Sequence, residues 1–160
     1  MANYLADTSA LIKLYHAEHG SEYMEQLIGN LGNRIYISPI TIVEFESVLA
    51  IKQRTLQIPA QEADNSRSRL RADLGWEFIR GTSPITPVHL RSAGLLIRRF
   101  GVTHSLRAMD AILVAIASEL YSEKRIHFFL TSDIRLFGVA KALGIPSIDP
   151  AGREPSVALF

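Results

Sequence analysis

Short apolar runs alternate along the chain with longer segments in which apolar residues recur at helical spacing. The runs predict strands, because they are rich in branched and aromatic residues and end at polar or turn-forming residues. They cover Tyr4–Ala6, Ile35–Ile37, Trp76–Ile79, Ile126–Leu130 and Pro146–Ile148. The predicted helices cover Ser9–Tyr15, Ser21–Leu31, Ile40–Arg54, Ala60–Leu74, Pro87–Phe100, Leu106–Tyr121 and Ile134–Leu143. Alternating strands and helices are typical of α/β proteins, so we expect a parallel sheet covered by helices on both faces.

Three of these helices predict where the core lies. The segment Leu106–Tyr121 is the most apolar, and we expect it to be buried on nearly all sides. In Pro87–Phe100 the residues at core spacing are Leu90, Ala93, Gly94 and Ile97. The segment Ile40–Arg54 is also strongly apolar, which makes any charged residue within it a candidate for a special role.

Length and composition describe an ordinary globular domain. The chain has 160 residues, of which 48% are hydrophobic and 21% charged, and this predicts one domain at residues 1–150 with a tail at 151–160. It has no cysteine, which excludes disulfides and thiolate metal sites and suits a cytoplasmic protein. The longest strictly apolar run, Ala111–Ala117, is too short to span a membrane, so we expect no membrane association.

The charges are unevenly distributed although the net charge is only +1. Residues 1–51 hold six acidic and two basic residues, whereas the segment Arg67 to Arg107 holds eight arginines and two acids. An arginine-rich segment is compatible with a phosphate-bearing partner such as RNA. The alternative is a solvated basic face, and for Arg67, Arg69 and Arg71 alone we favour that alternative.

Three aspartates lie at junctions between predicted strands and helices. Asp7 follows the first strand, Asp133 follows the fourth, and Asp110 lies in the first turns of the most apolar helix. Each has a simple structural explanation, because a carboxylate caps a helix or suits its positive end. Asp110 needs more than that, because an unpaired charge in so apolar a helix is costly to bury.

Glu44 is a fourth acid in an apolar setting. With about 100° between successive helical residues, it falls between the directions of Ile40, Val48 and Ile51. Its alternative explanation is a buried ion pair with an arginine. Glu46 points elsewhere on the same helix, and we interpret it as a solvent-side charge.

The four acids are expected to converge. Ligands of open α/β sheets bind outside the carboxyl ends of the strands, where Asp7, Asp110 and Asp133 would all lie. Several carboxylates at one edge repel one another unless a cation holds them, and oxygen ligands without cysteine suit Mg²⁺ or Mn²⁺. Such a cluster is typical of sites that activate water for attack on a phosphodiester.

Five segments, four of which carry these acids, resemble the PIN domain family, and within it the VapC-type toxins of toxin–antitoxin pairs. They are "YLADTSALIKLY", "ISPITIVEFESVLA", "LRAMDAILVAIA", "FLTSDIRL" and "AKALGIPSIDP". The resemblance implies a three-layer, Rossmann-like domain with a five-stranded parallel sheet, and Mg²⁺- or Mn²⁺-dependent endoribonuclease activity. It also implies a cognate antitoxin and a homodimer. Its metal-binding and catalytic acids would be Asp7, Glu44, Asp110 and Asp133. The hydroxyls of Thr8 or Ser9, and of Thr131 or Ser132, would steady these acids or the substrate phosphate, and the hydroxyls after Asp7 would cap its helix.

Two rival functions stay open at this point. One is a catalytically silent PIN fold that binds RNA or a protein. The other is a phosphatase or phosphoacceptor domain, which the sequence "DTS" weakens because no second Asp follows two residues later. The pair His16 and His19 has helical spacing but no third ligand, and we interpret it as a surface feature.

Overall fold

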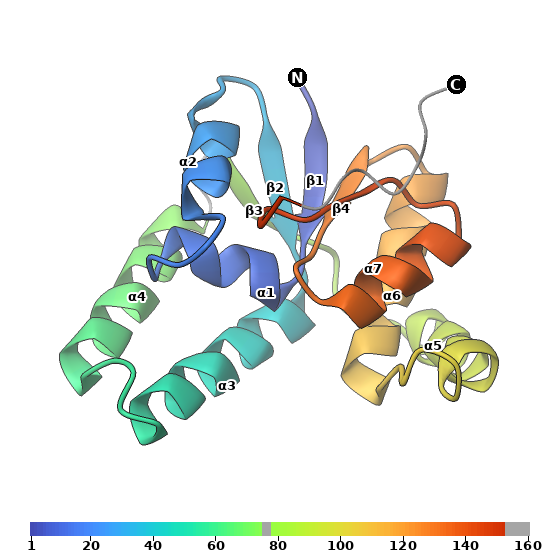
Figure 1. Cartoon of the computed structure of the whole chain (residues 1–160). Coiled ribbons are helices and arrows are strands. Elements are labelled where there is room, and N and C mark those ends of the chain that lie inside the picture. The colour runs from blue at the N-terminus through green and yellow to red at the C-terminus, as the bar shows by residue number, and fades with distance from the viewer. Residues whose placement is uncertain (75–77, 153–160) are drawn as a thin grey trace.

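The computed structural model describes residues 1–74 and 78–152, and within them five strands form one sheet (Figure 1). The strand order is β3-β2-β1-β4-β5, and every neighbouring pair runs parallel. The strands are β1 (Asn3–Ala6), β2 (Arg34–Ile37), β3 (Ile79–Gly81), β4 (Phe128–Leu130) and β5 (Ser147–Ile148). The predicted parallel sheet is therefore confirmed, with β1 at its centre.

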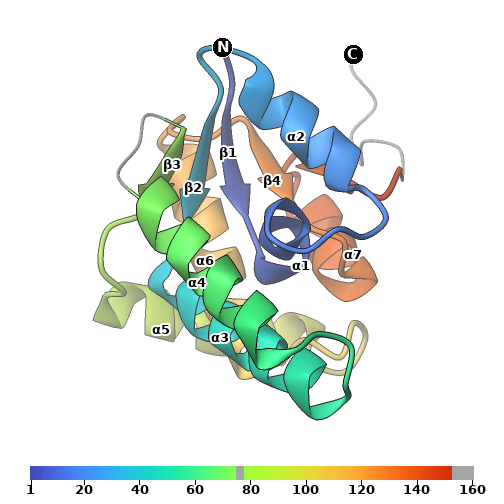
Figure 2. The same cartoon turned by 90° about the vertical axis from the view of Figure 1, so that its left-hand side faces the viewer.

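Helices connect the strands and cover both faces of the sheet (Figures 1 and 2). They are α1 (Thr8–Leu11), the 3₁₀ turn η1 (Ile12–Leu14), α2 (Ser21–Gly29), α3 (Pro39–Arg54), α4 (Ala60–Asp73), α5 (Pro87–Phe100), α6 (Ala108–Ser122) and α7 (Ile134–Ala142). In the described part of the chain no helix is long and apolar enough to cross a membrane.

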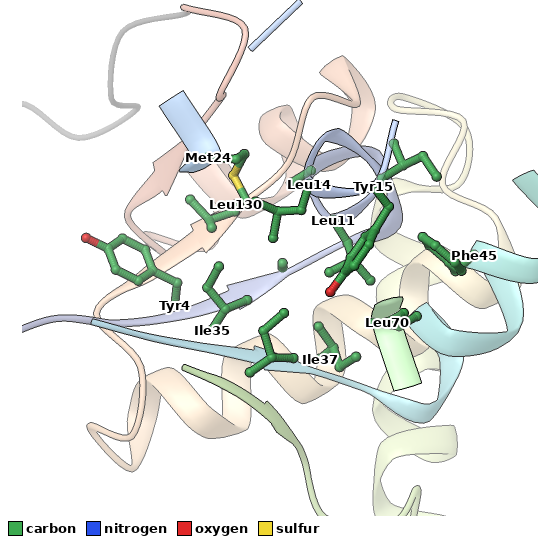
Figure 3. Packing of buried hydrophobic residues seen from close by; sticks show 14 of the residues in the cluster. Tyr4, Leu11, Leu14, Tyr15, Met24, Ile35, Ile37, Phe45, Leu70 and Leu130 are labelled. Carbon is green, nitrogen blue, oxygen red and sulfur yellow. The ribbon is translucent and has the colours of Figure 1, made fainter. Parts of the chain in front are cut away.

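Alternation along β1 divides the core into two layers. Tyr4 and Ala6 pack with α1 to α4 on one face, and Leu5 packs with α5, α6 and α7 on the other. Figure 3 shows the first layer, where Tyr15 meets Phe45 edge to face with ring centroids 5.5 Å apart. Because both faces are buried at the centre of the sheet, β1 from Tyr4 to Ala6 and the whole of β4 are apolar at successive positions, as expected for a parallel sheet.

Two predicted elements differ from the observed ones. The described third strand is Ile79–Gly81, which shares Ile79 with the predicted range Trp76–Ile79, and residues 76 and 77 of that range lie outside the described residues. The predicted helix Ser9–Tyr15 is a single α-helical turn, α1, that continues as η1. The tail predicted at 151–160 is described only at residues 151 and 152.

The helix α5 buries only part of the face that was predicted, with Ile97 half-buried against the core as expected. Leu90 is 53% exposed and Gly94 is also exposed, whereas His89 is buried. Ala93 is buried as expected. The buried position of His89 is possible because its Nδ1 accepts from Thr86 N–H and its Nε2 lies 2.5 Å from Glu119 Oε2. The contact between His89 on α5 and Glu119 on α6 accompanies the inward position of His89.

Candidate active site

A cleft of about 960 Å³ opens at the carboxyl edge of the sheet, where α1, α3, α6 and α7 begin. It brings together the four predicted acids and three of the four predicted hydroxyl residues. The lining includes Asp7, Thr8, Ser9, Glu44, Asp110, Ser132 and Asp133. The fourth hydroxyl residue, Thr131, is fully buried directly behind Asp7.

Asp7 is held at the base of this cleft by four hydrogen bonds. Thr131 Oγ1 donates to Asp7 Oδ2 at 2.7 Å, and Ser9 Oγ lies within 2.9 Å of both carboxylate oxygens. The backbone N–H of Ala10 donates to Oδ1 at 2.9 Å, so Asp7 is the N-cap of α1. Our expectation that the hydroxyls after Asp7 would cap this helix is wrong, because the carboxylate itself does so and leaves Ser9 free to bond to it.

Asp7 is also the most strongly perturbed acid of the cleft. Its side chain is only 3% exposed, and burial raises the pKa of its carboxyl to about 7. The hydrogen bonds from Thr131, Ser9 and Ala10 counter part of this shift, and the charge of Asp133 adds to it. The carboxyl therefore titrates near neutral pH, which is typical of functional sites.

Glu44 enters the cleft from the first half of α3. Thr8 Oγ1 donates to Glu44 Oε2 at 3.0 Å, so α1 and α3 are joined at the cleft. Burial raises the pKa of Glu44, and the charges of Asp110 and Asp133 raise it further. The buried face of α3 consists of Thr41, Phe45 and Leu49, and Ile51 is 44% exposed, so the apolar surround predicted for Glu44 is only partly correct.

Asp110 faces the same cleft from the first turn of α6. Burial raises the pKa of its carboxyl and the Asp133 charge adds to this, while the Arg135 charge and the Arg107 backbone oppose it. Most of the remainder of α6 is buried as predicted, from Ala111 through Leu120, with Ile112 and Ser118 half-buried and Glu119 exposed. Asp110 is thus the point where an otherwise apolar helix presents a charge to the cleft.

Asp133 differs from the other three because it has its own cation. Burial tends to raise the pKa of this carboxyl, but hydrogen bonds from Arg135 outweigh burial and lower it. Arg135 Nη2 lies 2.5 Å from Oδ2, and Arg135 Nε and backbone N both donate to Oδ1. Asp133 also caps α7 through that backbone bond. Arg135 was not predicted as a site residue, although its position two residues after Asp133 was the available signal.

The donor set of the cleft fits a hard divalent cation. All four acids offer carboxylate oxygens, with hydroxyls beside them, and the electrostatic coupling of Glu44 and Asp110 to Asp133 places these charges within reach of one another. Within residues 1–74 and 78–152, no three Asp, Glu, His or Cys side chains lie close enough together to hold a metal ion in their observed positions. Protein donors occupy the carboxylates instead, so binding an ion would exchange those bonds for bonds to the ion.

The arginine-rich segment is distributed over several surfaces. Arg67 pairs with Glu46 at 2.7 Å, which agrees with a solvent-side Glu46, and Arg69 donates to Leu14 O at 2.8 Å. From the segment Arg67 to Arg107 the cleft lining contains Arg107 alone among the described residues. Arg107 directly precedes α6, at the mouth of the cleft close to Asp110.

Two further features bear on the sequence analysis. His16 Nδ1 lies 2.9 Å from Glu62 Oε1, while His19 Nε2 contacts Ala151 O, so the two rings do not share a ligand. Asp149 was not predicted, although it follows the last strand as Asp7 follows the first. It is 2% exposed and accepts from Ser132 Oγ at 2.6 Å, which ties the end of β5 to the loop that carries Asp133.

The chain is similar to a known protein family and to solved structures with this architecture. The model of the PIN domain matches residues 4–142 of the chain. No curated protein sequence matches significantly.

Solved structures share the fold at low sequence identity. VapC20 of Mycobacterium tuberculosis, a sarcin-ricin-loop-cleaving toxin, is 16% identical with a TM-score of 0.59, over 89% of this chain and 95% of that one. VapBC2 of Rickettsia felis, bound to a DNA fragment from its promoter, is 18% identical with a TM-score of 0.56, over 92% and 98%. PAE2754 of Pyrobaculum aerophilum is 20% identical with a TM-score of 0.56, over 93% and 84%. At these identities the likeness establishes the shared fold.

Proposed function

The chain belongs to the PIN domain family, and from that premise we propose that it is a divalent-metal-dependent endoribonuclease serving as the toxin of a toxin–antitoxin pair. One observation carries the proposal: four carboxylates from four different elements line one cleft at the carboxyl edge of the sheet. Capping alone explains Asp7 and Asp133, but it does not explain why Glu44 and Asp110 face the same space. As an RNA-cutting toxin the protein would act in the cytoplasm.

The residues of the cleft have distinct proposed roles. Asp7, Glu44, Asp110 and Asp133 would hold Mg²⁺ or Mn²⁺, with the hydroxyls of Thr8, Ser9, Thr131 and Ser132 steadying the carboxylates. A bound cation supplies a water of lowered pKa and stabilises the charge that develops on the phosphate. Glu44 or Asp110 would accept the proton of that water, because burial raises the pKa of both carboxyls towards the working pH. Arg107 would hold the RNA backbone at the mouth of the cleft.

Exposed apolar surface supports the proposed partners. On α3, Val43 and Ile51 are 60% and 44% exposed and line the cleft, which suits an antitoxin segment lying beside the acids. An arginine of that segment would pair with the carboxylates. On α5, Val88, Leu90 and Leu95 are more than half exposed and suit a second copy of this chain. Light scattering of the purified chain, which would give the mass of a dimer, tests the second partner.

A matched pair of substitutions tests the catalytic proposal. Labelled single-stranded RNA is incubated with the purified protein in Mn²⁺, in Mg²⁺ or in EDTA. We expect cleavage only with metal, and Asp110→Asn should reduce its rate roughly 10²–10⁴-fold. Glu46→Gln should cleave like the wild type, because Glu46 pairs with Arg67 away from the cleft. RNA binding without metal-dependent turnover would favour the catalytically silent alternative.

A further inference from the structure

The end of the cleft away from the four acids is basic. Lys13 Nζ lies 2.9 Å from Glu18 Oε1, and Lys52 Nζ lies 3.3 Å from Glu18 Oε2. All three residues line the same cleft as the acids. The Lys13 side chain is 7% exposed and that of Lys52 is 14% exposed, so both charged side chains are largely withdrawn from bulk solvent. We define Lys13, Glu18 and Lys52 as the lysine end of the cleft.

The charges of the lysine end do not balance. Two ammonium groups share one carboxylate, which leaves one positive charge in excess at a largely buried position. Burying a second cation beside a carboxylate that one cation already neutralises costs desolvation energy. An anion that enters the cleft from solvent would compensate this excess charge.

The spacing along two packed helical segments sets the distance between the ends. Lys13 follows Asp7 by six residues along α1 and η1, and Lys52 follows Glu44 by eight residues along α3. At a rise of about 1.5 Å per residue these separations are about 9 Å and about 12 Å. In Figure 1 α1 and α3 leave the carboxyl edge of the sheet towards the same side, and the two helices contact each other. Acid and lysine therefore follow the same order along both walls.

The wall between the two ends is apolar. Ile12 on η1 and Val48 and Ile51 on α3 line the cleft at positions between the acids and the lysines. A surface of this kind suits a base or a ribose, which presents apolar faces as well as polar edges. The cleft thus offers an acidic end, an apolar wall and a basic end in sequence.

We propose that Lys13 and Lys52 form a phosphate subsite, which binds the backbone phosphate of single-stranded RNA adjacent to the one held at the acids. The assignment rests on the proposed ribonuclease function and extends it. Arg107 directly precedes α6, three residues before Asp110, whereas the two lysines lie on η1 and α3, so the cleft carries cationic side chains on different elements around the acids. The RNA strand then crosses the acids with cationic contacts from these elements. This arrangement offsets the repulsion between four carboxylates and a polyanion.

Binding in the absence of turnover tests the subsite. The probe is a fluorescent single-stranded RNA, titrated with protein in EDTA over a range of salt concentrations. Lys52→Gln keeps most of the side-chain length and removes the charge, and we expect it to weaken binding roughly fivefold. It should also reduce the slope of log K against log salt by about 0.7, the value for one phosphate of a single strand. Lys141→Gln, on the exposed side of α7 and outside the cleft, is the matched control and should keep the wild-type slope.

A modified RNA locates the contact. A series of probes carries one neutral methylphosphonate at successive positions, and each is measured with the wild type and with Lys52→Gln. At the subsite position the two losses should not add, because both changes remove the same ion pair. Lys52→Arg should restore the wild-type slope, and a thermal melt of each variant checks that it is folded.

The outcomes separate this inference from the function on which it rests. If the wild type binds RNA but Lys52→Gln and Lys13→Gln, both folded, keep its slope and affinity, the subsite is refuted and the ribonuclease proposal stands. If the folded wild type does not bind RNA in EDTA even at low salt but cleaves it in Mn²⁺, the subsite is refuted and the ribonuclease proposal stands. If it neither binds RNA in EDTA nor cleaves it in Mn²⁺, the ribonuclease proposal fails and the subsite fails with it. Additive losses at every methylphosphonate position would likewise overturn the subsite.

Discussion

The loops that follow β1 and β4 are built alike but differ in their electrostatics. Each ends in an aspartate that caps the next helix, Asp7 for α1 and Asp133 for α7. Two residues after Asp7 stands Ser9, which bonds to the carboxylate as a neutral donor. Two residues after Asp133 stands Arg135, which bonds to it as a cation. Burial raises the pKa of the first aspartate, which is almost fully buried, whereas at the less buried second aspartate the hydrogen bonds and charge of Arg135 outweigh burial and lower the pKa. Burial and the residue type at this one position therefore separate two sites of similar construction.

The largest expected effect is on RNA cleavage, when the carboxylate of the first of the two compared aspartates, Asp7, is removed. Asp7→Asn keeps the size of the side chain and the cap position but removes the carboxylate at the base of the cleft. If Asp7 is a metal ligand as proposed, cleavage of labelled RNA in Mn²⁺ should fall roughly a thousandfold or more. Near-normal cleavage by this variant, with a normal circular dichroism spectrum, would mean that Asp7 is a helix cap only.

The stability of the metal-free protein should show the second effect. The folded chain keeps Asp7 protonated up to about pH 7, whereas the unfolded chain ionises it near 3.8. The stabilising contribution of this proton is therefore complete below about pH 3.8 and is lost as the pH rises through about 7. The shift corresponds to at most about 4 kcal/mol, or on the order of 10 °C in melting temperature.

Thermal melts in EDTA at pH 5 and pH 8 measure this contribution. The wild type should lose stability between the two values, and Asp7→Asn should lose less. Mn²⁺ should restore the wild type at pH 8, because it binds the ionised folded form. If the melting temperatures of the two proteins change equally between pH 5 and pH 8, the raised pKa of Asp7 is contradicted. If Mn²⁺ does not change the melting temperature of the wild type at pH 8, the metal site is contradicted.

The smallest expected effect is on stability at acidic pH, when the second aspartate, Asp133, is given a neutral neighbour like that of Asp7. Arg135→Ser gives Asp133 the kind of neutral neighbour that Asp7 has, so the pKa of Asp133 should rise. In the wild type the lowered pKa stabilises the fold above the unfolded value, and this is lost as the pH falls through the folded value. The pair is partly exposed, so the contribution is about 1 kcal/mol or less.

Melts between pH 3 and pH 6 should therefore show less acid destabilisation in Arg135→Ser than in the wild type. Lys141→Ser, on the same helix and outside the cleft, is the control and should follow the wild type. If the loss of melting temperature between pH 6 and pH 3 is the same in Arg135→Ser as in the wild type, the ionisation of Asp133 does not depend on Arg135.

Much of the fold could be predicted because strand and helix periods differ along this chain. The parallel sheet and each connecting helix follow from that alternation, and the edge position of Asp7, Asp110 and Asp133 follows from parallel topology. Which face of a helix is buried could not be predicted where apolar residues surround the helix. On α3 the layer formed with α1 and α4 buries Phe45 and Leu49 and leaves Val43 exposed.

The pairing of charges in the cleft was harder to predict still. Glu44 was expected either in an apolar face or in a pair with an arginine, and its partner is the Thr8 hydroxyl from α1. Lys13 and Lys52 lie 39 positions apart in sequence and meet only because α1 and α3 pack together. Local patterns contain no information on such contacts, because these depend on how the finished layers are stacked.

The bond from Thr131 to Asp7 has a consequence for the order of events during protein synthesis. The two residues are separated by 124 positions, and β4, which pairs with β1 at the centre of the sheet, comes late in the chain. The ribosome synthesises the chain from its N-terminus, so Asp7 leaves the ribosome well before its hydrogen-bond partner Thr131 has been made. Pairings this distant in sequence are also slow to form. The nascent polypeptide therefore lacks an assembled cleft until β4 has left the ribosome, and the site is completed only after the residues between Asp7 and Thr131 have been synthesised.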